Sequence, residues 1–128
     1  MSDNIKTIAL VEREHGTIKK CSHAIESKFG DKIELVHFGT AKDALAFMAS
    51  HGVDLVISSL LQSQIDGIEL LNSSKEINPN VPFIIYTNLQ YKEEFFAWGF
   101  KPDAYVVRRE DMSELIIAVE GLLKIRQQ

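Results

Sequence analysis

The chain has 128 residues, of which 45% are hydrophobic and 25% charged, the size and composition of one globular domain with a single core. Its formal net charge of −4 argues against a nucleic-acid-binding surface, which needs a concentrated basic patch. No apolar run approaches the roughly 20 residues that span a bilayer, and the opening segment MSDNIKTIAL carries no signal-peptide pattern. We therefore expect one domain over residues 1–128 that lies in the cytoplasm and binds neither nucleic acid nor a membrane.

The first half of the chain alternates strand-like runs with helical spacing. Residues 6–11 form an apolar run typical of a buried strand, and residues 14–29 place apolar side chains at helical spacing up to Gly30, a residue type that commonly ends helices. Residues 32–38 alternate polar and apolar side chains, as a second strand does. Thr40 is then expected to cap a helix that ends at Gly52.

The second half repeats this alternation. In chain order we expect a strand at residues 54–58, a loop at 60–65, a helix at 66–77, a strand at 83–86, a short aromatic helix at 91–99, a strand at 104–107 and a helix at 113–125. The helix at 66–77 is expected to turn Ile68, Leu71 and Ile77 toward the core.

Five strands that alternate with five helices predict an α/β fold, in which a parallel five-stranded sheet lies between two layers of helices. In such folds, ligands bind beyond the carboxyl ends of the strands, near the point at which the strand order reverses. The residues that follow the strands are therefore the candidate site: Glu12, Arg13, Glu14, Ser58, Ser59, Thr87, Asn88, Arg108 and Arg109.

Three segments resemble the receiver domain of bacterial response regulators. Residues 54–71 (DLVISSLLQSQIDGIELL) resemble its third strand, active-site loop and third helix, where the family pattern reads D-L-V-L-L-D-x-x-L-P-x-x-D-G-x-E-L. Residues 81–87 resemble its fourth strand with the threonine Thr87, and residues 103–106 resemble its fifth strand with the switch aromatic Tyr105. The resemblance covers essentially the whole chain and implies a three-layer, flavodoxin-like (βα)5 fold.

The chain departs from the family pattern at the site itself. The aspartate that accepts a phosphoryl group in the family is Ser59 here, so the resemblance implies a degenerate phosphorylation site. The acidic pair that helps to hold Mg²⁺ is Glu12 and Arg13, which with Glu14 form the former metal pocket. Thr87, Tyr105 and Arg108 occupy the switch and phosphate-contact positions, with Arg108 in place of the family's lysine.

These departures remove the chemistry of phosphate acceptance, because serine is neutral at pH 7 and a divalent cation needs several oxygen ligands. We expect Arg13 to replace the cation, to pair with Glu12 or Glu14 and to donate to Ser59. Arg108 either bonds nearby carbonyl or carboxylate groups or points into solvent. The expected function is that of an atypical receiver in two-component signalling that acts as a phosphorylation-independent protein-interaction module, with no metal and no cofactor.

Other functions stay open at this point. The first alternative is a receiver that is still regulated, being phosphorylated or metal-bound by another route. A more distant alternative is a flavodoxin-like ligand-binding domain, although the segment EREHGTIKK lacks a phosphate cradle. Another is a serine hydrolase using Ser59, His15 and Glu14, although the glycines of a nucleophile elbow are missing. We expect that the chain is not an enzyme.

The expected partner is a kinase, an output or scaffold protein, or a second copy of the chain. The resemblance implies docking on the surface of the fourth helix, fifth strand and fifth helix. On that surface Phe96 and Tyr105 are the interface candidates, because aromatic side chains often anchor interfaces. Phe95 and Trp98, three residues apart, and Tyr91, one turn earlier, are expected to face the sheet instead.

Overall fold

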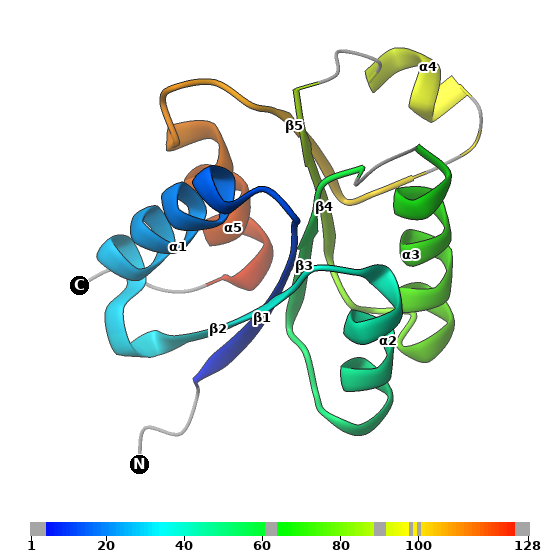
Figure 1. Cartoon of the computed structure of the whole chain (residues 1–128), viewed down its shortest axis with the longest axis horizontal. Coiled ribbons are helices and arrows are strands. Elements are labelled where there is room, and N and C mark those ends of the chain that lie inside the picture. Colours follow the sequence, from blue (N-terminus) through cyan, green and yellow to red (C-terminus); the bar gives the residue numbers. More distant parts are fainter. Residues whose placement is uncertain (1–4, 61–63, 89–91, 98, 100, 125–128) are drawn as a thin grey trace.

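The computed structural model of the chain describes residues 5–60, 64–88, 92–97, 99 and 101–124 (Figure 1). The side chains of residues 64–66 and 95 are outside this description, as are the expected orientations of Tyr91, Phe95 and Trp98. The strands are β1 (Lys6–Val11), β2 (Ile33–Phe38), β3 (Leu55–Ser58), β4 (Phe83–Thr87) and β5 (Ala104–Val107). The helices are α1 (His15–Phe29), α2 (Ala41–Ser50), α3 (Gln64–Ile77), α4 (Lys92–Ala97) and α5 (Ser113–Leu123), with a 3-10 turn at Gly30–Lys32.

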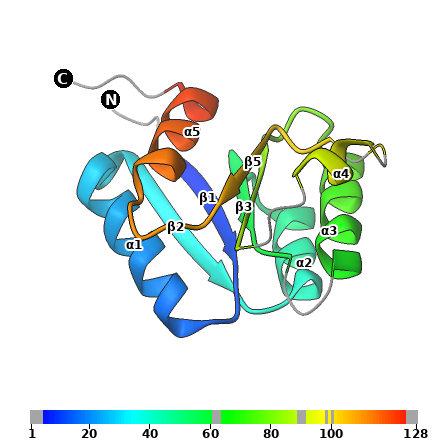
Figure 2. The ribbon, with the colours of Figure 1, turned by 90° about the horizontal axis from the view of Figure 1, so that it is seen from above.

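The expected fold class is confirmed. All five strands are parallel and lie in the order β2-β1-β3-β4-β5. Helices α1 and α5 cover one face of the sheet, and α2 and α3 cover the other (Figure 2). Each face therefore has its own apolar core, one between the sheet and α1 and α5, the other between the sheet and α2 and α3. Among the described residues, no helix is long and apolar enough to cross a membrane.

The strand register brings the candidate site together. Val11 lies opposite Phe38 on one side and Ser58 on the other, and Thr87 lies opposite Val107. Because the strands are parallel and end at the same level, the residues that follow them meet at one edge of the sheet.

Two aspartates fix this register from the opposite edge. Asp54 directly precedes β3, and its Oδ2 accepts the backbone N–H of Thr7 in β1 at 2.8 Å. Asp103 precedes β5 in the same way, and its Oδ2 accepts the backbone N–H of Phe83 in β4 and a hydrogen bond from Lys75 Nζ, both at 2.8 Å. Each carboxylate thus accepts a backbone N–H from the beginning of the neighbouring strand, which fixes the register of the pairs β1–β3 and β4–β5.

Most expected boundaries hold within two residues, and the cap residues are confirmed. Gly30 ends α1 with φ of 57°, a value that suits glycine. Thr40 Oγ1 accepts the backbone N–H of Asp43 at 3.1 Å, as an N-cap does. Helix α2 ends at Ser50, before Gly52, and α3 begins at Gln64, two residues earlier than expected.

The inward face of α3 was predicted partly wrongly. Ile77 is 43% exposed, Leu71 is buried as expected, and Ile68 is partly buried. The buried stripe consists of Gly67, Leu70, Leu71 and Ser74. A Cβ atom on Gly67 would lie 2.8 Å from Leu60 Cδ2 and 3.1 Å from Leu60 Cα, so α3 approaches the end of β3 closely where it has no side chain.

Candidate functional site

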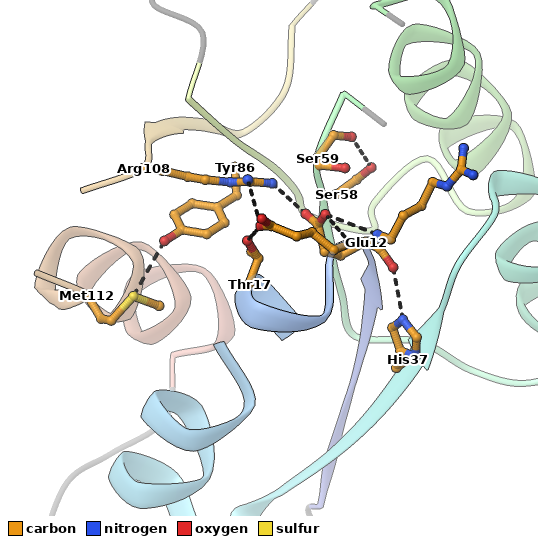
Figure 3. Close-up of polar contacts among 10 residues, drawn as sticks. Glu12, Thr17, His37, Ser58, Ser59, Tyr86, Arg108 and Met112 are labelled. Carbon is orange, nitrogen blue, oxygen red and sulfur yellow. Dashed lines mark hydrogen bonds and ion pairs between the residues drawn. The ribbon is translucent and has the colours of Figure 1, made fainter. Parts of the chain in front are cut away.

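The candidate site is a group of polar side chains at the carboxyl edge of the sheet (Figure 3). The backbone N–H of Ser59 donates to the carbonyl of Val11 at 3.1 Å, which ties the residue after β3 to the end of β1. The backbone N–H of Arg108 donates to the carbonyl of Thr87 at 2.7 Å, which ties the residue after β5 to the end of β4. The loops that carry these residues therefore start from fixed positions.

Glu12 is the centre of this group and is only 5% exposed. Its Oε2 accepts the backbone N–H groups of Arg13 and Glu14, each at 3.0 Å. Its own backbone is held as well, because its N–H donates to the carbonyl of Phe38 at 3.0 Å and its carbonyl oxygen lies 2.9 Å from His37 Nε2. The turn between β1 and α1 thus points the carboxylate inward.

Arg108 supplies the opposite charge. Its Nη2 lies 2.5 Å from Glu12 Oε1, and its Nη1 lies 3.8 Å from Glu14 Oε1. Its guanidinium lies over the ring of Tyr86, with Cζ 5.4 Å from the ring centroid, an arrangement suited to a cation–π interaction. The Glu12 side chain is 7% exposed and that of Arg108 22%, so water screens this ion pair only weakly.

Ser59 lies beside this pair at the end of β3 and is buried, as are Ser58 and Thr87. Ser58 Oγ donates to the backbone carbonyl of Ser59 at 2.6 Å. Ser59 and Thr87 both have further interaction partners. The expected site residues of β1, β3, β4 and β5 are therefore brought to one edge, and Arg108 is the cation among them.

The expectation that Arg13 pairs internally is wrong. Its side chain is exposed, and within the described part of the chain no ion pair or hydrogen bond joins its guanidinium to Glu12, Glu14 or Ser59. The reason is the alternation of side chains where β1 ends: Glu12 turns inward and its neighbour turns outward. Of the two outcomes considered for Arg108, bonding to a carboxylate is the one observed.

The two interface candidates differ in accessibility. Phe96 in α4 is 37% exposed, as expected of a side chain that points away from the sheet. Tyr105 in β5 is only 4% exposed and packs in the core under α2 and α3. Tyr105 is thus not an accessible interface residue in this conformation, because its inward position on the strand buries the ring.

A hydrolase-like triad is not formed. Glu14 accepts a hydrogen bond from Thr17 Oγ1 and lies beside Arg108. In the part of the chain that the structure covers, no hydrogen bond links His15 to Glu14 or Ser59. His15 and Glu14, as the structure describes them, therefore do not form the oriented base that the proposed triad needs.

Comparison with known proteins places this geometry in a family. No protein-family model matches the chain. The heme response regulator HssR of Staphylococcus saprophyticus is 31% identical over 100 residues, which make up 72% of this chain and 43% of HssR, so the chain spans less than half of that relative's length. Two solved structures match nearly the whole chain at 26% identity. They are the signal receiver domain of an HD domain-containing protein from Pseudomonas fluorescens Pf-5 (TM-score 0.79, 93% of this chain and 94% of that one) and the receiver domain of the Francisella response regulator 1452 (TM-score 0.72, 93% and 97%).

The chain is a response-regulator receiver domain. Such a domain is a signalling module rather than a conventional enzyme, which removes the support for the hydrolase and for an unrelated flavodoxin-like binding domain. The expected fold and family are thereby confirmed.

The oxygen ligands that the structure describes at this edge of the sheet do not fit a divalent cation. Mg²⁺ requires oxygen ligands in near-octahedral geometry and several of them must be free. Here both oxygens of Glu12 are engaged, and Glu14 faces Thr17 and Arg108. Among the described residues, no three histidine, cysteine or acidic side chains form a group that could hold a metal ion. Arg108 already supplies a positive charge at this position.

Two residues of the site, Tyr86 and Met112, were not singled out from the sequence. The ring of Tyr86 lies under Arg108, and its hydroxyl donates to Met112 Sδ at 3.4 Å. Burial, and then the nearby thiol of Cys21, raises the pKa of Tyr86 to about 12, so the phenol stays protonated and donates. The available signal was alternation in β4, which puts Tyr86 and Ile84 on the face opposite to Thr87.

Removal of the Arg108 charge is expected to destabilise the receiver domain. Arg108→Leu leaves the buried Glu12 carboxylate without its counter-ion, and we expect the free energy of unfolding to fall by about 2 kcal/mol, less than for a fully buried pair because Arg108 is partly exposed. Arg13→Leu is the matched control and should change it by no more than about 0.5 kcal/mol. Urea unfolding followed by circular dichroism measures both; equal losses in the two variants would contradict the assignment of Arg108 as the internal cation.

Proposed function

We propose that this receiver domain is atypical: Ser59 no longer accepts phosphate, and the domain works as a phosphorylation-independent protein-interaction module in two-component signalling. The observation that carries the proposal is the ion pair of 2.5 Å between Arg108 and Glu12, next to a serine at the end of β3. The described residues share one sheet and two cores, which supports a single domain over residues 1–128.

The chemistry of Ser59 supports this proposal. Transfer of a phosphoryl group needs a nucleophile in line with phosphorus and positive charge on the developing phosphate oxygens. Serine is neutral at pH 7 and becomes nucleophilic only beside a general base, whereas the family's aspartate is ionised at that pH. A phosphoserine would also be a stable ester, whereas a receiver resets through a labile aspartyl phosphate.

The electrostatics of the pocket support it as well. The pair of Glu12 and Arg108 carries no net charge, so its carboxylate attracts a second cation less strongly than a free acidic pair would. Arg108 in turn is directed to Glu12 and Tyr86, rather than being free to reach an incoming phosphate. The Glu12–Arg108 pair therefore occupies the place where the family binds a metal ion and a phosphate group.

Incubation with acetyl phosphate and Mg²⁺ is expected to leave the receiver domain unmodified, because Ser59 replaces the acceptor carboxylate and both oxygens of Glu12 are already engaged. Intact-mass spectrometry measures this directly. The Ser59→Asp variant combined with Arg108→Lys is the matched control, since it restores the family's residues at these two positions. A stoichiometric, hydroxylamine-labile adduct on the unaltered chain would contradict the proposal. Such an adduct would favour a receiver that is regulated by another route.

We propose further that partners dock on the face formed by α4, β5 and α5. Receiver domains interact with kinases and output domains, and a second copy of the chain is another candidate. Phe96 in α4 and Ile117 in α5 support this choice, because they are exposed apolar side chains, at 37% and 67%. Large exposed apolar side chains are common at the centres of interfaces.

Phe96→Ser is expected to weaken self-association or capture of a cognate kinase or output domain, while the melting temperature stays nearly unchanged because the ring is exposed. Ile77→Ser is the matched control, as Ile77 is also an exposed apolar side chain but lies at the end of α3, away from this face. Sedimentation velocity and a pull-down measure the two effects. Unfolding of the Phe96 variant would mean that the ring belongs to the core, and equal loss of association in both variants would mean that the surface lies elsewhere.

A further inference from the structure

We propose that Tyr86 relays the state of the Glu12–Arg108 ion pair to the first turn of α5. The relay rests on the ion pair that carries the proposed function, and it concerns how that pair is coupled to the rest of the molecule. The chain of contacts runs from Glu12 through Arg108 and Tyr86 to Met112, as Figure 3 shows.

The first step joins Arg108 to Tyr86. Glu12 holds the guanidinium by its Nη2 atom, and the ring of Tyr86 lies 5.4 Å below Cζ. Arg108 is thus fixed by two different forces, an ion pair from one side and the aromatic face from the other. If Glu12 is lost as a partner, only the 3.8 Å contact with the exposed Glu14 carboxylate still holds the guanidinium from that side, so its position over the Tyr86 ring is weakened.

The second step joins Tyr86 to α5. The hydroxyl of Tyr86 donates to Met112 Sδ at 3.4 Å, and Met112 is the N-cap residue of α5. The carbonyl of Met112 accepts the backbone N–H of Ile116 at 3.0 Å, which closes the first turn of the helix. A methionine side chain cannot cap the free N–H groups of a helix. Two contacts hold this end of α5 instead: Tyr86 contacts Met112, and the Asp111 carboxylate accepts the backbone N–H of Ser113 at 2.9 Å and its hydroxyl at 3.0 Å.

The loop between Arg108 and Met112 is therefore attached to β4 at both ends. At its beginning, the backbone N–H of Arg108 donates to the carbonyl of Thr87, and at its end Met112 accepts from Tyr86. The two neighbouring residues of β4, Tyr86 and Thr87, hold the two ends of this loop. A shift of Arg108 at one end is therefore transmitted to Met112 at the other end. By linkage, a partner that displaces the first turn of α5 must change the stability of the ion pair by the same free energy.

The amide of Ile116 reports on this relay, because it donates the hydrogen bond that closes the first turn. In Arg108→Leu, we expect its hydrogen exchange to rise about tenfold relative to the amide of Ile25 in α1, which corrects for any global loss of stability. Arg108→Lys keeps the charge but loses the planar contacts of the guanidinium with Glu12 and Tyr86, so it should restore only part of the protection. Arg109→Leu is the matched control on the same loop; it removes an exposed pair with Glu114 and should leave Ile116 unchanged.

The decisive comparison repeats Arg108→Leu in a Tyr86→Phe background, which keeps the ring and removes the hydroxyl. There the change at Ile116 should be less than about twofold, because the contact that transmits it is gone. A tenfold rise in both backgrounds, an equal rise at Ile25, or no rise at all would overturn the relay. If Arg108→Leu does not fold, Glu12→Gln breaks the same pair from the other side and the same readings apply. The exchange experiments contain no phosphate donor and no metal, so their outcome does not depend on the proposed function. Phosphorylation of Ser59 in the mass-spectrometry experiment would refute the proposed function but would not affect the evidence for the relay.

Discussion

The carboxylate of Glu12 is almost fully removed from water, and a charge in such a position needs both hydrogen-bond donors and a charge of opposite sign. The donors are the backbone N–H groups of Arg13 and Glu14 in the β1–α1 turn, and the opposite charge is Arg108, which lies 96 positions further along the chain. One ion pair therefore joins the residues that follow β1 and β5, and its guanidinium lies over Tyr86 of β4. The β1–α1 turn, the β5–α5 loop and the ring of Tyr86 all take their positions from it.

This arrangement changes what the edge of the sheet can do. A cluster of unpaired carboxylates draws in a cation and, with it, a phosphate, whereas a neutral internal pair attracts neither strongly. Ser59 adds a second restriction, because it is buried and a serine hydroxyl is uncharged at pH 7. The proposed role as an interaction module follows from these two restrictions together. The surface that carries the exposed side chains of Phe96 and Ile117, rather than the former phosphorylation site, is then the expected site of function.

Much of the fold could be predicted because its signals are local. Gly30 and Thr40 end and begin helices through their own backbone and side-chain chemistry, and both were recognised. The inward stripe of α3 was missed in part, since two of its members, Gly67 and Ser74, are not apolar and do not contribute to a hydrophobic pattern. Gly67 is there because the helix approaches Leu60 closely, a contact that spacing alone does not reveal. The partner of Glu12 was predicted wrongly for a similar reason. Arg13 is its neighbour in the sequence, but strand register brings Arg108 to its carboxylate.

If the pair of Glu12 and Arg108 takes the place of a bound cation, as we propose, then a calorimetric titration with Mg²⁺ at matched ionic strength should detect no binding to the unaltered domain. The same titration should detect clear binding to the variant that combines Ser59→Asp with Arg108→Lys. Lysine is the family's residue at that position, and its single ammonium group cannot reproduce the planar contacts of the guanidinium with Glu12 and Tyr86. Equal affinity of both proteins for Mg²⁺ would contradict this proposal, because the internal pair would then leave the metal site open.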